Sequence, residues 1–398
     1  MIPLADRGPL RVMFVTTSMP IGGAETLLVE LVRRMDRSRF LPELCCLKRF
    51  DSLGESLAEE IPAFTGLLAG KFDVAVLWRL ARLMRRRRID AVVTVGPGDK
   101  MFWGRLAARL AGVPVVCSAL HSTGLPDHVE LPNRLLSPLN DAFIAVAESH
   151  GCYLADHEGC PAKKVRVIPN GVDLQRFHPR WPDRKLQREL DLDPGAPIVG
   201  IIAALRPEKN HELFLYVAAL VHVELPEARF LIVGDGPRRS KLEALARSLG
   251  VEEAVRFLGI RRDVPELLSL MDVVTLTSKM EANPLCLLEA MASEKPVVAS
   301  RVGSVTESVQ DGRTGYLAAA GDSQGMAARV LELLHDRRRA SSMGRAAREA
   351  VIARWSVDRM VRGYEDLIAD IYSAKCGTTG TSNVEGRMTE ERRRSKTE

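Results

Sequence analysis

Short apolar runs alternate with helix-length amphipathic segments along most of this 398-residue chain. The first run, Arg11-Val-Met-Phe-Val-Thr16, has the length and residue types of a buried strand, and Ala24–Met35 follows with helical spacing. Further strands are expected at Leu44–Leu47, Ala91–Val95, Pro114–Ala119, Ala142–Val146 and Lys164–Ile168, with helices at Met101–Ala111 and Glu148–Glu158. This alternation predicts a parallel β-sheet with helices on both faces.

The alternation stops near Asn170 and then resumes. Asn170-Gly171 is a turn signal, and Pro179 and Pro182 continue the irregular stretch, which indicates a linker. A second series of strands is expected at Ile198–Ala203, Arg229–Val233, Val255–Leu258, Val273–Leu276 and Val297–Ala299. The sequence therefore predicts an α/β protein with two doubly wound, Rossmann-like domains, at residues 1–174 and 175–355.

The C-terminal part of the chain has no further strand pattern. From Asp322 to Ser373 the apolar spacing is helical. Residues 374–398 are rich in Gly, Thr, Ser, Glu and Arg and nearly free of apolar side chains. Because such a segment cannot bury a core, we expect it to be disordered.

Composition and charge exclude several classes of protein. With 46% hydrophobic and 27% charged residues, the chain is typical of a soluble globular protein. The formal net charge of +5 is modest and no nucleic-acid-binding module is visible, so no nucleic-acid partner is expected. Charged residues interrupt the N-terminal segment and no run has the length of a membrane helix, which predicts a cytoplasmic protein. The seven cysteines are scattered without metal-ligand spacing, so reduced thiols and no metal site are expected.

Two cations follow the first strand of the second domain. Arg206 and Lys209 lie where that strand leads into a helix, and open α/β sheets bind ligands at the carboxyl ends of their strands. Two cations beside helix N-terminal amides favour a diphosphate. Taken alone, such a pair is more often a solvated basic loop, since charged residues are mostly exposed.

Two glycine-containing segments follow the next two strands. Gly234 and Gly236 permit tight turns and the close approach of a ligand to the backbone. The backbone of Gly259, Ile260 and Arg261 could hydrogen-bond a planar base. Each segment alone is equally compatible with an ordinary loop.

Two carboxylates stand eight residues apart where a further strand leads into a helix. Glu289 is expected on the helix and Glu281 on the loop, and a carboxylate accepts two hydrogen bonds from a vicinal diol. Glu289 could therefore hold ribose and Glu281 a sugar hydroxyl, although an isolated pair also fits ordinary loop and helix acids. The residues between them offer backbone amides at the start of the helix, except at the proline: Ala282, Asn283, Pro284 and Leu285.

The first domain offers candidates at its own strand ends. Gly22 and Gly23 follow the first strand and open a helix, without the dinucleotide-binding spacing. His121 follows the strand Pro114–Ala119, although a lone histidine is more often structural. The segment Gly96-Pro-Gly-Asp-Lys100 lacks the spacing of a P-loop, so ATP hydrolysis is not expected.

The helix expected at Trp78–Arg88 is strongly basic. The run Arg85, Arg86, Arg87 and Arg88 stands beside Leu80, Leu83 and Met84. Basic amphipathic helices bind anionic membrane surfaces, which would make the protein peripheral at the cytoplasmic face of a membrane. A solvated helix face explains the same pattern equally well.

In their order, these segments resemble the retaining GT-B glycosyltransferases of family 4 over roughly residues 10–370. The resemblance rests on Gly22-Gly23-Ala24-Glu25, His121-Ser122, Val167–Asp173, Leu205–His211, Val233–Pro237, Phe257–Gly259, Glu281–Ala292, Pro296–Ser300, Val302–Glu307 and Asp311–Gly315. One departure is Ala282 where the family usually has glycine, with Asn283 after it. The resemblance implies two Rossmann-like domains facing a cleft, with a final helix at 356–373 crossing back to the first domain.

The resemblance also implies a reaction. A sugar would pass from a UDP- or GDP-linked donor to an acceptor hydroxyl with retention, in the synthesis of cell-surface glycans, polysaccharides or glycolipids. No cofactor would be required, and the acceptor would be a glycan, a lipid-linked molecule or a small molecule. A nucleotide-sugar 2-epimerase and an inactive nucleotide-sugar-binding protein stay open as alternatives.

The roles that the resemblance implies fall on the residues already singled out. Arg206 and Lys209 would stabilise the leaving diphosphate, and Glu289 would anchor ribose. Glu281 would position the donor sugar and His121 would contact it from the other domain. Gly22 and Gly23 would let their loop close over the diphosphate.

Overall fold

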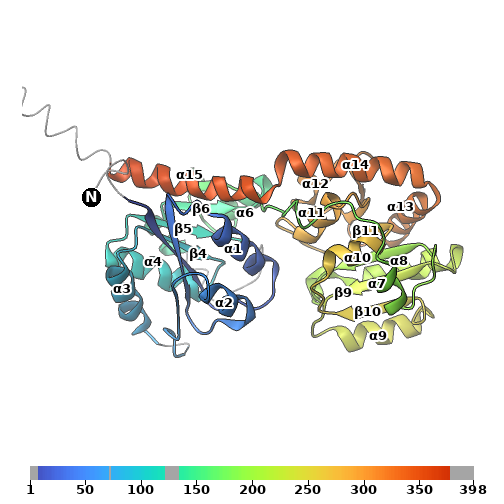
Figure 1. The fold of residues 1–398 in the computed structure, drawn as a ribbon, viewed down its shortest axis with the longest axis horizontal. Coiled ribbons are helices and arrows are strands. Elements are labelled where there is room, and N and C mark those ends of the chain that lie inside the picture. The colour runs from blue at the N-terminus through green and yellow to red at the C-terminus, as the bar shows by residue number, and fades with distance from the viewer. Residues whose placement is uncertain (1–7, 71–72, 122–133, 377–398) are drawn as a thin grey trace, which may run out of the picture. The chain divides into compact units, whose positions relative to one another are not determined.

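The computed structural model describes residues 8–70, 73–121 and 134–376. The chain divides into two compact units (Figure 1). Unit 1 comprises residues 1–146, 151–168 and 360–398, and unit 2 comprises residues 147–150 and 169–359. Each unit contains one parallel sheet, as the alternation of apolar runs predicts.

The sheet of unit 1 has the order β3-β2-β1-β4-β5-β6-β7, with all strands parallel. Its strands are β1 (Leu10–Thr16), β2 (Phe40–Cys46), β3 (Ala63–Thr65), β4 (Ala91–Val95), β5 (Val115–Ala119), β6 (Ala142–Ala145) and β7 (Val165–Val167). The central strands are almost wholly apolar and buried on both faces, as expected when helices cover a parallel sheet.

The helices of unit 1 follow the strands. Those described between its strands are α1 (Gly23–Arg34), α2 (Asp51–Ala58), α3 (Val76–Arg87), α4 (Asp99–Ala111) and α6 (Glu148–Asp156), whose first residues belong to unit 2. One hydrophobic core forms where α3 and α4 pack on one face of the sheet, and it includes Met13, Leu80, Met84 and Val92.

The sheet of unit 2 has the order β10-β9-β8-β11-β12-β13 and is also parallel. Its strands are β8 (Ile198–Ile202), β9 (Arg229–Val233), β10 (Val255–Gly259), β11 (Val273–Leu276), β12 (Val297–Ser300) and β13 (Tyr316–Ala318). Its helices are α7 (Arg184–Glu189), α8 (His211–Glu224), α9 (Arg239–Ser248), α10 (Val264–Leu270), α11 (Leu285–Ala292), α12 (Val305–Ser308), α13 (Ser323–His335) and α14 (Arg337–Arg354).

In each sheet the strand order reverses beside the first strand of the unit. In unit 1 the reversal lies between β1 and β4, and in unit 2 it lies between β8 and β11. Such a switch point leaves a crevice at the carboxyl ends of the two strands, where doubly wound sheets bind their ligands. Unit 2 is therefore expected to bind its ligand at the loops that follow β8 and β11.

The last helix, α15 (Val357–Cys376), corrects the predicted start of the disordered tail. Residues 374–376 were expected to be disordered, but they form its last turn. The Lys375 ammonium donates to the carbonyl of Pro114 at 2.7 Å and pairs with Asp141 at 2.5 Å, and Cys376 is buried. These tertiary contacts hold the turn, although its local sequence is polar. The rest of the predicted tail lies outside the described residues.

No helix in the described part of the chain is both long and apolar enough to cross a membrane.

Candidate functional site

An ion pair joins the two loops at the switch point of unit 2. Lys209 ends a short 3-10 helix, Pro207–Lys209, after β8, and Glu281 lies between β11 and α11. The Lys209 ammonium lies 2.6 Å from Glu281 Oε1, and the Ser278 hydroxyl donates to the same oxygen at 2.6 Å. The Glu281 side chain is only 8% exposed. The structure therefore brings together two residues that sequence analysis placed on separate loops.

The ammonium of Lys209 stays charged in this position. Burial alone would lower the pKa of Lys209, but the charge and hydrogen bond of Glu281 outweigh it, so the pKa is raised. Two further hydrogen bonds join the same two loops: the Thr277 hydroxyl donates to the Lys209 carbonyl at 3.0 Å, and the Lys279 backbone amide donates to the Glu208 carbonyl at 2.8 Å. A fixed cation therefore stands at the switch point.

A third loop, after β12, holds the backbone of Glu281. The Ser304 amide donates to the Glu281 carbonyl at 3.2 Å. Gly303 has φ +47°, and a Cβ there would stand 2.1 Å from the same carbonyl oxygen. Only glycine permits both this left-handed backbone and this close approach.

Arg206 differs from Lys209 in its surroundings. It precedes the 3-10 helix with extended backbone, and its side chain is exposed. Within the described ranges, its guanidinium makes no hydrogen bond or ion pair. Arg206 thus lies on the predicted loop but outside the Lys209–Glu281 pair.

Glu289 lies on α11, one turn beyond the loop, and is partly buried. Burial raises its pKa to about 7, and the charge of Arg176 opposes this only in part. Its carboxylate has no hydrogen-bond partner among the residues that the structure describes. At neutral pH this acid is therefore divided between its neutral and ionised forms, and a ligand hydroxyl would favour the ionised form.

The glycines after β9 and β10 serve contacts between loops. Gly234 has φ +133°, a Cβ there would lie 2.1 Å from the Ala203 carbonyl oxygen, and its amide donates to Gly259 at 2.8 Å. A Cβ on Gly236 would lie 2.7 Å from the Leu205 carbonyl oxygen. The glycines thus let the loops after β8 and β9 pack backbone to backbone, a structural reason that sequence analysis did not foresee.

The segment after β10 presents an apolar side chain and a neutralised cation. Ile260 is 64% exposed. Arg261 pairs with Asp263 at 2.5 Å and lies 3.7 Å from Glu189, and the hydrogen bond that its guanidinium donates to Asp263 raises its pKa. The Arg261 side chain is thus engaged within the protein, which leaves the backbone as its means of contacting a base.

The loop from Ala282 to Leu285 is mostly buried. Pro284 caps α11, which begins at Leu285, and Ala282 and Asn283 are 5% and 7% exposed. The Asn170 side-chain amide donates to the Asn283 carbonyl at 2.9 Å. Sequence analysis treated Asn170 as part of a turn and did not single out Ser278, because neither residue belongs to a motif with an evident chemical purpose.

The candidates of unit 1 lie at separate strand ends. Gly22 precedes α1 with φ −159°, an extended backbone that any residue adopts, and Gly23 is the first residue of that helix. The Glu25 carboxylate occupies the position beside Gly22, 2.4 Å from where a Cβ would stand. His121 follows β5 and is partly buried, while Ser122 beside it lies outside the described residues.

The basic helix α3 uses its apolar side for packing. Leu80 and Met84 are buried in the core of unit 1, and Leu83 packs against the same core. These three side chains pack inside unit 1 and so are not presented to a membrane surface. The expected contact of Arg85–Arg88 with an anionic membrane stays a prediction. Arg87 forms two hydrogen bonds with the buried Glu43, while Arg85, Arg86 and Arg88 are exposed.

Across the described residues, no group of three His, Cys, Asp or Glu side chains is placed to hold a metal ion.

Two family profiles match the chain. The profile "Glycosyltransferase Family 4" matches residues 21–176, and the profile "Glycosyl transferases group 1" matches residues 182–350.

Curated relatives of the chain carry related names. The chain is 31% identical over 324 residues to the putative glycosyltransferase EpsF of Bacillus subtilis strain 168, covering 76% of this chain and 81% of that protein. It is 29% identical over 305 residues to the N-acetyl-alpha-D-glucosaminyl L-malate synthase of Bacillus anthracis, covering 75% and 80%. It is 28% identical over 383 residues to a GDP-mannose-dependent phosphatidylinositol monomannoside mannosyltransferase of Mycobacterium tuberculosis, covering 90% and 98%.

Solved structures share the fold. Anabaena Alr3699/HepE in complex with UDP and glucose superposes with a TM-score of 0.78 at 23% identity, covering 91% of this chain and all of that chain. WaaG, a glycosyltransferase involved in lipopolysaccharide biosynthesis, superposes with a TM-score of 0.71 at 15% identity, covering 90% and 99%.

Proposed function

This chain belongs to the GT-B glycosyltransferases of family 4, and we propose that it moves a hexose from a UDP- or GDP-linked donor to an acceptor hydroxyl with retention at the anomeric carbon. It is a hexosyltransferase on the evidence of its family. The observation that carries the proposal is the Lys209–Glu281 pair at the switch point of unit 2, with Ser278 on the same carboxylate.

The leaving group is the first part of the proposal. When the bond between the anomeric carbon and the diphosphate breaks, negative charge grows on the phosphate oxygen that departs. Lys209 would stabilise that charge, because its ammonium is already desolvated and held in place by Glu281. Arg206, exposed at the start of the same loop, would add a second cation.

The donor sugar would lie against Glu281 and the loop that follows. Lys209 and Ser278 both contact Oε1 of Glu281, and Oε2 makes no hydrogen bond to a described residue. That second oxygen would accept from a sugar hydroxyl. The loop of Ala282, Asn283, Pro284 and Leu285 would complete the contact, with Asn170 fixing its position.

The nucleotide would lie across α11 and the loops after β9 and β10. Glu289 would accept from the ribose hydroxyls, which would favour its ionised form. The exposed Ile260 would cover one face of the base, while the backbone of Gly259 and Arg261 would read its edge. Gly234 and Gly236 would keep the neighbouring loop close to the phosphates.

The acceptor would bind at unit 1. His121 would contact the donor sugar, and the loop of Gly22 and Gly23 would close on the diphosphate. We propose a glycan, a lipid-linked molecule or a small molecule as acceptor, in the synthesis of glycans or glycolipids. Support comes from the relatives, one of which is named for L-malate and another for phosphatidylinositol monomannoside. No cofactor beyond the nucleotide sugar is part of the proposal.

A donor panel tests the proposal. UDP-glucose, UDP-galactose, UDP-N-acetylglucosamine and GDP-mannose would each be mixed with the purified chain, and the donor that binds should raise Tm by mass action. Transfer from that donor to a panel of glycan, lipid-linked and small acceptors should give a product whose anomeric configuration, read by NMR, matches the donor. An inverted product would contradict retention. A donor whose sugar changes configuration without any acceptor would indicate a 2-epimerase instead.

A further inference from the structure

A cavity of about 250 Å³ lies at the amino edge of the unit 2 sheet, away from the carboxyl edge that holds Lys209 and Glu281. On one side it is lined by residues that directly precede strands, such as Pro197 before β8 and Pro296 before β12. On the other side it is lined by the end of α13 and the start of α14, which lie side by side (Figure 1). We call it the amino-edge cavity. The proposed transfer reaction makes no use of it.

Four charged side chains line the amino-edge cavity, two of each sign. Lys295 and Arg337 are the cations, and Asp272 and Glu294 are the carboxylates. Within the part of the chain that the structure describes, none of these four side chains forms an ion pair. Because charged groups that are shielded from water are stabilised by partners, a cavity lined in this way favours a ligand that carries both charges.

Lys295 is the cation that is partly withdrawn from water. Its ammonium donates to the Ser269 carbonyl at 3.1 Å and makes no other hydrogen bond to a described residue. Burial lowers the pKa of Lys295, and the charges of Asp272 and Glu294 oppose this only in part. Since an ammonium can donate more than one hydrogen bond, Lys295 has donors available for an acceptor in the cavity.

The loop that carries Lys295 has an uncommon backbone conformation. Glu294 has φ +58°, in the left-handed region that a glutamate seldom adopts. Gly344 of α14 lets the helix pack on this loop, because a Cβ there would lie 2.0 Å from the Glu294 carbonyl oxygen. The Glu294 carboxylate makes no hydrogen bond within the described ranges. Such strain is retained chiefly where a side chain is used, which points to the cavity that Glu294 lines.

We propose that the amino-edge cavity binds a free amino acid with an apolar side chain. Lys295 and Arg337 would pair with its carboxylate, because hydrogen bonds between charged groups are the strong ones. Asp272 and Glu294 would accept from its ammonium in the same way. A simple anion fits less well, since it would stand beside those two carboxylates. The ligand's side chain would contact the apolar part of the lining: Pro197, Met271, Leu333 and Leu334.

The size of the cavity agrees with a small ligand. Pockets for drug-sized molecules have roughly 300–1,000 Å³, so the amino-edge cavity is too small for a nucleotide sugar. The binding therefore goes beyond the transfer reaction and does not depend on it.

Calorimetry on the full chain tests this proposal. The probes are L-leucine, L-isoleucine, L-methionine and L-phenylalanine, of which at least one should bind. For leucine the matched analogues are 4-methylpentanoate, which lacks the amine, and 3-methylbutylamine, which lacks the carboxylate. Each analogue should bind about 10- to 100-fold more weakly than leucine, the effect of losing hydrogen bonds to a charged group. The analogues of another bound amino acid would be compared in the same way.

Variants of the lining assign the two ends of the ligand. Lys295→Met keeps the apolar stem and should lower affinity for the amino acid about 10- to 100-fold. Arg337→Ala should lower it as well, and this side chain is exposed, so its removal leaves the core intact. Glu294→Gln should weaken binding of the amino acid but not of the analogue that lacks the amine. Arg338→Ala is the matched control, because it removes an exposed arginine of α14 that does not line the cavity.

Three results would overturn the proposal: no binding of any of the four amino acids, equal affinity for the amino acid and its analogues, or affinity that survives both Lys295→Met and Arg337→Ala. A loss in Arg338→Ala as large as in Arg337→Ala would also overturn it. Far-UV circular dichroism and Tm would show that each variant folds. Nucleotide affinity and transfer, measured in the same variants, should stay unchanged, so failure here is distinguishable from failure of the proposed reaction.

Discussion

The two sheets have matching strand orders around their switch points, yet their carboxyl ends are built differently. In unit 2, side chains from separate loops bond one another, as Lys209, Glu281 and Ser278 do. In unit 1, the loops after β1 and β2 are joined by backbone bonds, such as Lys48 N–H to the Thr17 carbonyl at 3.0 Å and Met19 N–H to the Phe50 carbonyl at 3.1 Å. One topology thus carries a fixed charge pair in one unit and a backbone framework in the other.

In the proposed reaction, this difference suits the two edges to different tasks. A desolvated cation held by a carboxylate is suited to developing charge, which is the electrostatic part of catalysis. An edge held by backbone bonds leaves its side chains available to contact the acceptor that we propose for unit 1. The fold alone therefore does not decide function, because the chemistry lies in the loops that each unit carries.

Removing the cation of unit 2 should have the largest effect. Lys209→Ala should lower kcat by about 10²- to 10³-fold, the cost of losing one group that stabilises transition-state charge, with a smaller change in KM. Steady-state kinetics would measure both constants. Lys241→Ala, an exposed lysine on α9, is the control and should be neutral. A change confined to KM would contradict the leaving-group role.

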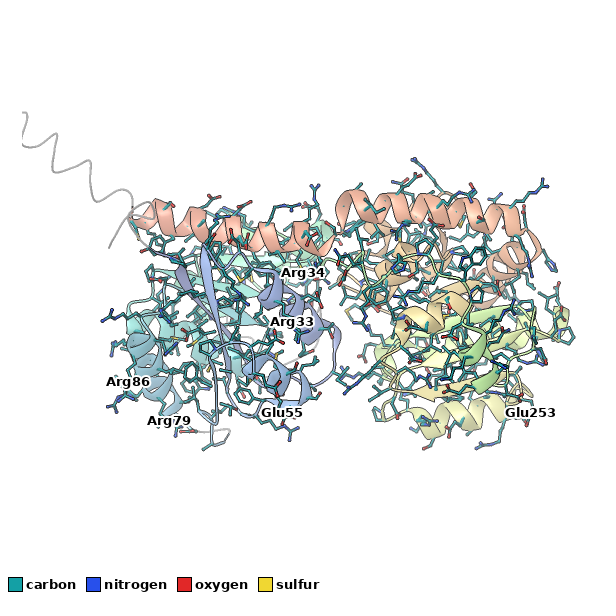
Figure 2. All side chains as sticks on the ribbon, viewed as in Figure 1. Arg33, Arg34, Glu55, Arg79, Arg86 and Glu253 are labelled. Atoms are coloured by element: carbon teal, nitrogen blue, oxygen red, sulfur yellow. The ribbon has the colours of Figure 1, made fainter. Side chains whose placement is uncertain are left out.

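Removing the acid of α11 should act on nucleotide binding. Glu289→Ala should weaken UDP or GDP affinity by about 10- to 100-fold, the range for a lost hydrogen bond to a charged group. Calorimetry would measure the affinity. Glu253→Ala, an exposed acid before β10 at the amino edge of the sheet, is the control (Figure 2). Unchanged affinity in Glu289→Ala would refute the ribose assignment.

A smaller effect is expected from the residue that supports the sugar loop. Asn170→Ala removes the donor to the Asn283 carbonyl and should raise the donor KM by about tenfold, the cost of one hydrogen bond, with little effect on UDP inhibition. Kinetics with UDP as a competitive inhibitor would separate the two constants. Equal weakening of the donor and of UDP would place Asn170 at the nucleotide instead of the sugar.

The smallest expected effect is on the pH dependence of the free energy of unfolding, measured without ligand. Burial raises the pKa of Glu289 from 4.5 to about 7, so the folded chain binds this proton more tightly than the unfolded chain does. The stability that this group contributes should be complete below pH 4.5 and should be lost as pH rises through 7. Urea unfolding of the unchanged chain and of Glu289→Gln would show their difference falling across that window. A constant difference would contradict the assigned burial.

Much of the fold could be predicted from the alternation of apolar runs, because buried parallel strands require continuous apolar segments. The strands at Ala91–Val95, Arg229–Val233 and Val273–Leu276 occur where expected. β3 was not predicted, because its three residues are too short a run to stand out. The last turn of α15 was mistaken for tail, because its stability comes from contacts with Pro114 and Asp141, far away in sequence.

The family was predictable because many weak motifs occur in order, and the two family profiles confirm it. The switch point brings the loops of Lys209 and Glu281 together. The sequence alone places that switch point only approximately, so it did not predict the pairing. The contributions of Ser278 and Asn170 were not predicted, since a hydroxyl or amide that holds another side chain leaves no spacing signal. The chemical roles of all the site residues, those of Lys209, Glu281 and Glu289 included, remain predictions.

Because Gly303 has no side chain, the loop after β12 can pack against the Glu281 carbonyl. The position of Glu281 therefore depends on a residue that is distant from it in sequence. Any larger residue there would push the Glu281 carbonyl away and move the partner of Lys209 with it. If the pair has the proposed role, a larger residue at position 303 should lower activity while the chain still folds. Substitutions of Gly303 in natural variants should therefore lower activity as substitutions of Lys209 or Glu281 do.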